Sequence, residues 1–119
     1  MPSESDHISK AQHNRKFADA CPPKFHTSAG WALTALFYSA LHYVEAYNGR
    51  YNKHCSNHND VKDSIVRNPE LEAIFDDYTE LLDYSWNARY QAKKYGEAEI
   101  REAQICQESV ANHVSNLLR

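Results

Sequence analysis

The chain has 119 residues, of which 42% are apolar and 12% aromatic, with only 3 Gly and 4 Pro. This length suits one domain, residues 1–119, and the composition excludes collagen-like, low-complexity and disordered chains. The scarcity of turn residues disfavours a β-sandwich. With 13 Lys and Arg against 16 Asp and Glu, the net charge is −3. This charge disfavours a protein that binds along DNA grooves through bulk phosphate attraction.

The cysteines and the apolar segments indicate the cellular compartment of the protein. Cys21, Cys55 and Cys106 are odd in number and widely spaced, which disfavours both a disulfide framework and a zinc knuckle. The polar residues 1–6 do not resemble a secretory signal, and the most apolar window, residues 31–44, is shorter than the roughly 20 residues of a membrane span. We therefore expect a cytoplasmic protein with reduced thiols and no membrane partner.

The first predicted helix runs from about residue 5 to residue 21. Ser3 or Ser5 can cap it, and Pro22 and Pro23 must end it.

The second predicted helix has the strongest period in the sequence. Thr27 or Ser28 offers a cap, and Gly49 ends the helix after about Asn48. Its wide apolar arc predicts that it runs through the centre of the domain. The residues that repeat at spacings of three and four are Leu33, Leu36, Phe37, Ala40, Leu41, Val44 and Tyr47.

Two further helices are predicted between residues 57 and 90. Asn57 or Asn59 caps a short one, and Asn68 ends it and caps the next, with Pro69 at the first helical position. The apolar stripe of this fourth helix is Leu71, Ile74, Phe75, Tyr78, Leu81, Leu82 and Trp86.

A fifth helix is predicted from Gly96 to the C-terminus, with one buried seam. Since no segment alternates like a strand, the sequence predicts an all-α, antiparallel up-and-down bundle of four to five helices. The seam consists of Ile100, Ala103, Cys106, Val110, Val114 and Leu117.

Three histidines, His42, His54 and His58, cluster at the end of the second helix and in the loop after it. Their spacing matches no strong metal-ligand motif, so we expect solvated or capping histidines and no metal. The three glycines are isolated from one another, which excludes a phosphate-binding glycine loop, and we expect no cofactor.

The segment from Ser85 to Tyr90 is the most unusual because it combines two large aromatic rings with a hydroxyl group and a cation. On a helix, Ser85 and Arg89 point the same way. One interpretation is that Arg89 binds phosphate while Trp86 and Tyr90 stack on bases. The other is that Arg89 pairs with an acidic residue and both rings pack in the core.

The order of features resembles the HEPN family of small helical bundles. An aromatic- and Ala-rich second helix, GWALTALFYSALHYVEAY at 30–47, is followed by a His-rich loop, a short helix and LLDYSWNARY at 81–90. The resemblance covers most of the chain. It implies a bundle that dimerises, in a family of metal-independent ribonucleases and of nucleotide-binding companions of nucleotidyltransferases. It also implies a toxin or defence setting.

In the catalytic members, an Arg-x4-6-His motif builds a composite site across the dimer. Three residues separate Arg50 from His54 here, and seven separate Arg50 from His58, so neither pair matches the motif. The resemblance therefore favours a homodimeric module that binds RNA, a nucleotide or a neighbour-encoded protein. A metal-independent endoribonuclease is the alternative.

For cleavage, a histidine must act as acid or base and a cation must stabilise the phosphorane charge. The candidate catalytic residues are His58, His54 and Arg89. The candidate binding residues are Arg50, Ser85, Trp86, Tyr90 and His42.

Overall fold

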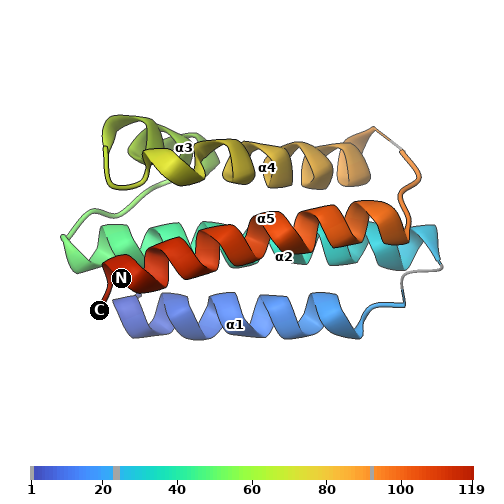
Figure 1. Cartoon of the computed structure of the whole chain (residues 1–119), viewed down its shortest axis with the longest axis horizontal. Helices are drawn as coiled ribbons and strands as arrows, with labels where there is room; N and C mark the ends of the chain where they lie inside the picture. Colours follow the sequence, from blue (N-terminus) through green and yellow to red (C-terminus); the bar gives the residue numbers. More distant parts are fainter. Residues whose placement is uncertain (1, 23–24, 92) are drawn as a thin grey trace.

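The computed structural model describes residues 2–22, 25–91 and 93–119. These residues form five α-helices and a short 3₁₀ helix, and no strand occurs among them. Consecutive long helices run antiparallel (Figure 1), so the predicted all-α bundle is confirmed. The elements are α1 (Glu4–Ala20), α2 (His26–Arg50), α3 (His58–Arg67), η1 (Glu72–Ile74), α4 (Phe75–Tyr90) and α5 (Glu97–Leu117).

The helix α2 is the centre of the bundle, as its wide apolar arc predicts. It packs against α1, α3, α4 and α5. Figure 1 shows α1 on one side of α2 and α5, and α3 with α4 on the other. The side chains of Leu33, Leu36, Phe37 and Val44 on α2 are fully buried. Burial of such side chains stabilises the fold by about 1.5–3 kcal/mol each.

Ser3, one of the two predicted caps, begins α1. Its hydroxyl accepts a hydrogen bond from the backbone N–H of Asp6 at 3.1 Å, and the Asp6 carboxylate accepts one from the Ser3 N–H at 2.9 Å. This capping box satisfies two free N–H groups of the first turn. The helix ends at Ala20, before Pro22; Pro23, the second predicted stop, lies outside the described residues.

Both predicted ends of α2 are wrong by a small margin. The helix begins at His26 after Phe25, which makes no side-chain cap, so Thr27 and Ser28 already lie inside its first turn. It continues through Gly49 to Arg50. Asn52, with φ of 59°, takes the left-handed conformation that turns the chain out of the helix.

The predicted start of the fourth helix is also wrong. The Asn68 side chain accepts a hydrogen bond from the N–H of Glu70, two residues on, at 3.0 Å and therefore forms a local turn. Its amide group also donates to the Tyr47 hydroxyl at 3.2 Å. The chain then passes through η1, and α4 begins only at Phe75. Asn57 does cap α3, as predicted, by accepting from the Asp60 N–H at 2.9 Å.

The predicted seam of α5 is confirmed except at its last residue, Leu117, which is only partly buried. Ile100, Ala103, Cys106, Val110 and Val114 are buried. The helix follows Gly96, whose N–H donates to the Glu99 carboxylate at 2.8 Å.

The three cysteines, at 21, 55 and 106, are free thiols. Within the described ranges, every helix is too short or too polar to cross a bilayer.

Candidate functional site

Two helices and the start of a third bring polar and aromatic side chains together at one place. Thr27, Trp31, Thr34 and Tyr38 recur every three or four residues and so lie along one face of α2. The last turn of α4 supplies Arg89 and Tyr90, and the first residue of α3 is His58. Apart from Tyr38, which contacts Arg89, these side chains line two cavities that adjoin at Arg89 and Tyr90.

Arg89 is held in a fixed orientation by neutral partners. Its Nε donates to the carbonyl oxygen of Ser85 at 3.2 Å, and Nη2 donates to the Ser85 hydroxyl at 3.1 Å. Its Nη1 donates to the Tyr38 hydroxyl at 3.2 Å. Among the described residues, no carboxylate forms an ion pair with Arg89. The three hydrogen bonds use three of the five N–H groups of the guanidinium. The other two, with the positive charge, are available to an anionic ligand.

Aromatic rings surround this guanidinium. Its Cζ lies 5.1 Å from the centroid of the Tyr90 ring and 5.7 Å from that of Tyr38. The rings of Trp86 and Tyr90 are 4.6 Å apart. Trp86 is 51% exposed, Tyr90 60% and Trp31 56%. The interpretation that Trp86 and Tyr90 pack in the core is therefore wrong, and their faces are available to a ligand.

The charges of the two cavities differ. The larger, of about 580 Å³, is lined by Lys93, Lys94 and His26 as well as Arg89, and none of its lining residues is acidic. The smaller, of about 310 Å³, is lined by His58 and Trp86 and also by Asp83. The larger cavity thus offers a positive environment that suits phosphate.

The imidazole of His58 packs against the rings of Phe37 and Tyr38, and its pKa depends on the charge of Arg89. Its ring centroid lies 5.4 Å from that of Phe37 and 5.5 Å from that of Tyr38, both edge to face. Burial, and secondly the positive charge of Arg89, lower the pKa of His58 below its ordinary value. The imidazole is therefore neutral at pH 7 and able to accept a proton.

The structure gathers five of the sequence-predicted site residues here. His58, Arg89, Trp86 and Tyr90 line the cavities. Ser85 is fully buried, and its hydroxyl accepts a hydrogen bond from Arg89. The prediction that the two side chains point the same way is therefore confirmed.

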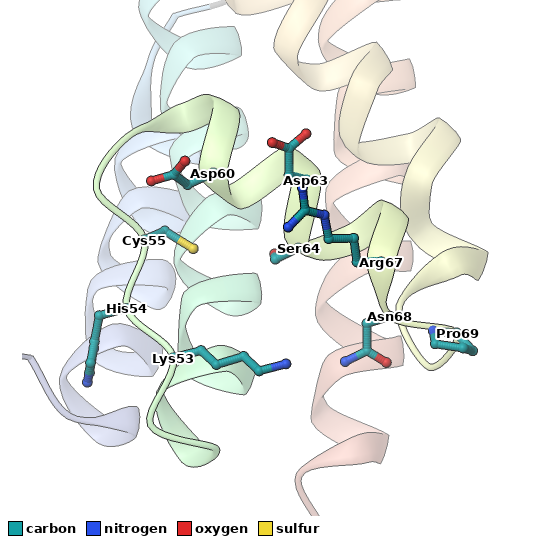
Figure 2. Close-up of a pocket in the computed structure, with 9 residues that line it drawn as sticks. All are labelled: Lys53, His54, Cys55, Asp60, Asp63, Ser64, Arg67, Asn68 and Pro69. Carbon is teal, nitrogen blue, oxygen red and sulfur yellow. The ribbon is translucent and has the colours of Figure 1, made fainter.

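The other three predicted site residues lie elsewhere. Arg50, at the far end of α2, forms an ion pair with Glu4 at 2.6 Å. His42 contacts His7 of α1. His54 lines a separate cavity of about 650 Å³ between the segment after α2 and α3 (Figure 2). That cavity carries the carboxylates of Asp60 and Asp63 beside Lys53 and Arg67, so it lacks the excess positive charge that phosphate prefers.

Sequence reasoning missed Tyr38 and Trp31 as site residues. Both belong to the aromatic-rich helix, where their rings resemble core residues. One signal was present: Trp31 and Tyr38 share a face with the polar Thr27 and Thr34, which a purely apolar face would not contain.

Comparison with known proteins supports the fold but no family. No protein-family model matches the chain, and no curated protein matches it. A solved structure, that of the protein TT1696 from Thermus thermophilus, is similar with a TM-score of 0.74 at 18% sequence identity. The similarity covers 98% of this chain and 98% of that chain. The whole all-α arrangement therefore recurs in a distant protein.

Proposed function

We propose that this protein binds single-stranded RNA, or the nucleotides that compose it, at the cavities around Arg89. The observation that carries the proposal is a guanidinium fixed by Tyr38 and Ser85, without a carboxylate partner among the described residues, beside exposed aromatic rings. Sequence-tolerant binding of single strands needs a cation for the phosphate and an aromatic face for the base.

The arrangement of the groups supports a bound phosphate at Arg89. The two N–H groups that remain on the guanidinium, with Lys93 and Lys94 on the wall of the larger cavity, supply positive charge. Trp31 lies in the same cavity, while Trp86 lies in the adjoining one. A strand that crosses Arg89 therefore meets an aromatic ring on each side.

Binding is tested by fluorescence anisotropy with a short labelled RNA oligonucleotide. We expect Arg89→Ala and Trp86→Ala each to weaken binding about tenfold, in the range of one lost stacking or phosphate contact. Matched controls are Arg101→Ala, whose side chain is 69% exposed on α5, and Phe17→Ala, 55% exposed on α1. Equal affinity of all four variants would refute the site.

Metal-independent cleavage of RNA is the second candidate, and the shared cavity of His58 and Arg89 favours it. Neutral His58 would take the proton of a ribose 2′-hydroxyl as its oxygen attacks the adjacent phosphorus. Arg89 would stabilise the charge on the phosphorane oxygens while the 5′-oxygen leaves with a proton from solvent.

Cleavage is tested in excess chelator with single-stranded RNA, and the products are examined for 2′,3′-cyclic phosphate ends. We expect His58→Ala to abolish cleavage and His54→Ala to leave it unchanged, because His54 lines other cavities. Intact RNA after long incubation with a high protein concentration would leave binding as the function.

We further propose that the protein acts as a homodimer in the cytoplasm, beside a neighbour-encoded partner such as a nucleotidyltransferase or a toxin–antitoxin component. The support is the resemblance in the sequence. Light scattering tests the dimer, with a mass near twice 13.7 kDa expected. Co-purification of the neighbouring gene product tests the partner.

A further inference from the structure

Three potential ligand atoms converge at a second place, between α1 and α2. His7 comes from the start of α1, and His42 and Glu45 lie three residues apart on α2. The His7 Nδ1 lies 3.1 Å from the His42 Nδ1 and 3.2 Å from the Glu45 Oε2, and the His42 Nδ1 lies 3.5 Å from the same Oε2. We name these residues the His7 triad.

Hydrogen bonds can join at most two of the three sides of this triangle. Each ring nitrogen carries at most one hydrogen, and the carboxylate oxygen carries none when ionised. If both Nδ1 atoms are protonated, two N–H groups face each other across 3.1 Å. If only one is protonated, the lone pair of the other faces the carboxylate oxygen. In each of these states, one of the three contacts brings two donors or two acceptors together.

A cation that binds all three atoms removes this conflict. A tetrahedral zinc ion with bonds of about 2.0–2.1 Å holds neighbouring ligand atoms about 3.3 Å apart. The three separations, 3.1, 3.2 and 3.5 Å, bracket that value. The atoms therefore already lie at the corners of one face of a tetrahedron.

We propose that His7, His42 and Glu45 bind one divalent transition-metal ion of the zinc type. Imidazole ligands favour such ions, and two histidines with one carboxylate form a known zinc ligand set. Such a site would join α1 to α2 and would be separate from the Arg89 cavities. It departs from the expectation from sequence, which predicts no metal and groups His42 with His54 and His58.

Burial and access both suit this assignment. His7 is buried, and its side chain is only 10% exposed, while that of Glu45 is 20% exposed. A cavity of about 200 Å³ reaches His7 and Glu45 and is also lined by His54 and Cys55. It gives an ion a path from solvent and room for a fourth ligand.

The test is a zinc titration of the full chain, without a histidine tag and after removal of metal with a chelator. Competition with a chromogenic chelator should show one Zn²⁺ per chain. We expect His7→Ala and His42→Ala each to weaken binding at least about tenfold. His13→Ala, an exposed histidine on the same helix as His7, should bind as the wild type does.

Glu45→Gln keeps the size of the side chain and removes its charge, so it provides a variant that should still fold. Circular dichroism checks its helix content. With Co²⁺ as a probe, we expect a visible absorption band in the wild type that is weakened in this variant. Mg²⁺, which prefers oxygen ligands, should not compete. The proposal is overturned if the wild type does not bind Zn²⁺ at micromolar concentration, or if a His7→Ala/His42→Ala variant binds it equally well.

Discussion

The guanidinium of Arg89 donates to the hydroxyl of Tyr38 at 3.2 Å and thereby joins the last turn of α4 to the middle of α2. The same tyrosine ring packs edge to face against His58. Tyr38 therefore stands between the two groups on which binding and cleavage would depend.

The first prediction concerns Tyr38 as a positioning residue. Tyr38→Phe keeps the ring beside His58 and removes one hydrogen bond to Arg89, of about 1.5–3 kcal/mol for a charged donor. We expect RNA affinity to fall several-fold while the helix content by circular dichroism stays unchanged. Tyr43→Phe, on the same helix and outside the cavities, is the control. Unchanged affinity in Tyr38→Phe would show that Ser85 alone orients the guanidinium.

The second prediction uses intrinsic fluorescence. The chain has two tryptophans, Trp31 and Trp86, and each lines one of the adjoining cavities. We expect acrylamide to quench both in the free protein and bound RNA to protect them, since stacked bases cover the rings. Trp86→Phe should retain part of the protection. No change on addition of saturating RNA would place the strand elsewhere.

The third prediction concerns the Tyr78 hydroxyl, which is buried without a hydrogen-bond partner in the described structure. An unsatisfied buried polar group costs about 1–3 kcal/mol. We therefore expect Tyr78→Phe to raise the free energy of unfolding by about 1 kcal/mol, measured by urea denaturation. Tyr51→Phe, at a 53% exposed position, should change it little. A loss of stability in Tyr78→Phe would indicate that a water molecule satisfies the hydroxyl.

The fourth prediction is a pH dependence. The pKa of His58 is lowered by burial and by Arg89, so the unfolded chain takes up a proton near the ordinary value of 6.5 and the folded chain only at lower pH. Stability should therefore fall as the pH drops below about 6.5. We expect His58→Gln to reduce this loss in urea denaturation between pH 7 and pH 5. Part of the pH dependence of stability should remain in this variant, because the pKa of His7 is also lowered.

The fifth prediction concerns a polar contact inside the bundle. The Ser39 hydroxyl donates to the Ala11 carbonyl at 2.8 Å and accepts from the Gln107 amide at 3.1 Å, so it joins α1, α2 and α5. Ser39→Ala leaves the buried Gln107 amide without this acceptor, which should cost about 1–3 kcal/mol of unfolding free energy. Ser109→Ala, exposed on α5, should cost less than about 0.5 kcal/mol.

The helices could be predicted because each buries an apolar stripe at helical spacing. Leu33 to Tyr47 and Ile100 to Val114 show this directly, and all of these stripe residues are buried. The start of α4 could not be predicted, because Asn68 and Pro69 suit a turn as well as the start of a helix. The contact of the Asn68 side chain with Tyr47, distant in sequence, accompanies the turn.

The candidate site was predictable only where its residues are close in sequence. Ser85 and Arg89 are four apart on one helix, so their contact follows from helical geometry. The approach of His58 to Arg89 depends on how α3 packs near α4. His42 and Glu45 also share a helix face, but their proximity to His7 required the packing of α1 on α2.

Tyr38 and His42 are one helical turn apart on α2, about 6 Å along its axis. Tyr38, the positioning residue of Arg89, and His42 of the His7 triad thus lie on the same rigid helix. A paramagnetic ion held by the triad would shorten the nuclear relaxation times of the Tyr38 ring, so magnetic resonance could report the spacing between the two places without a crystal.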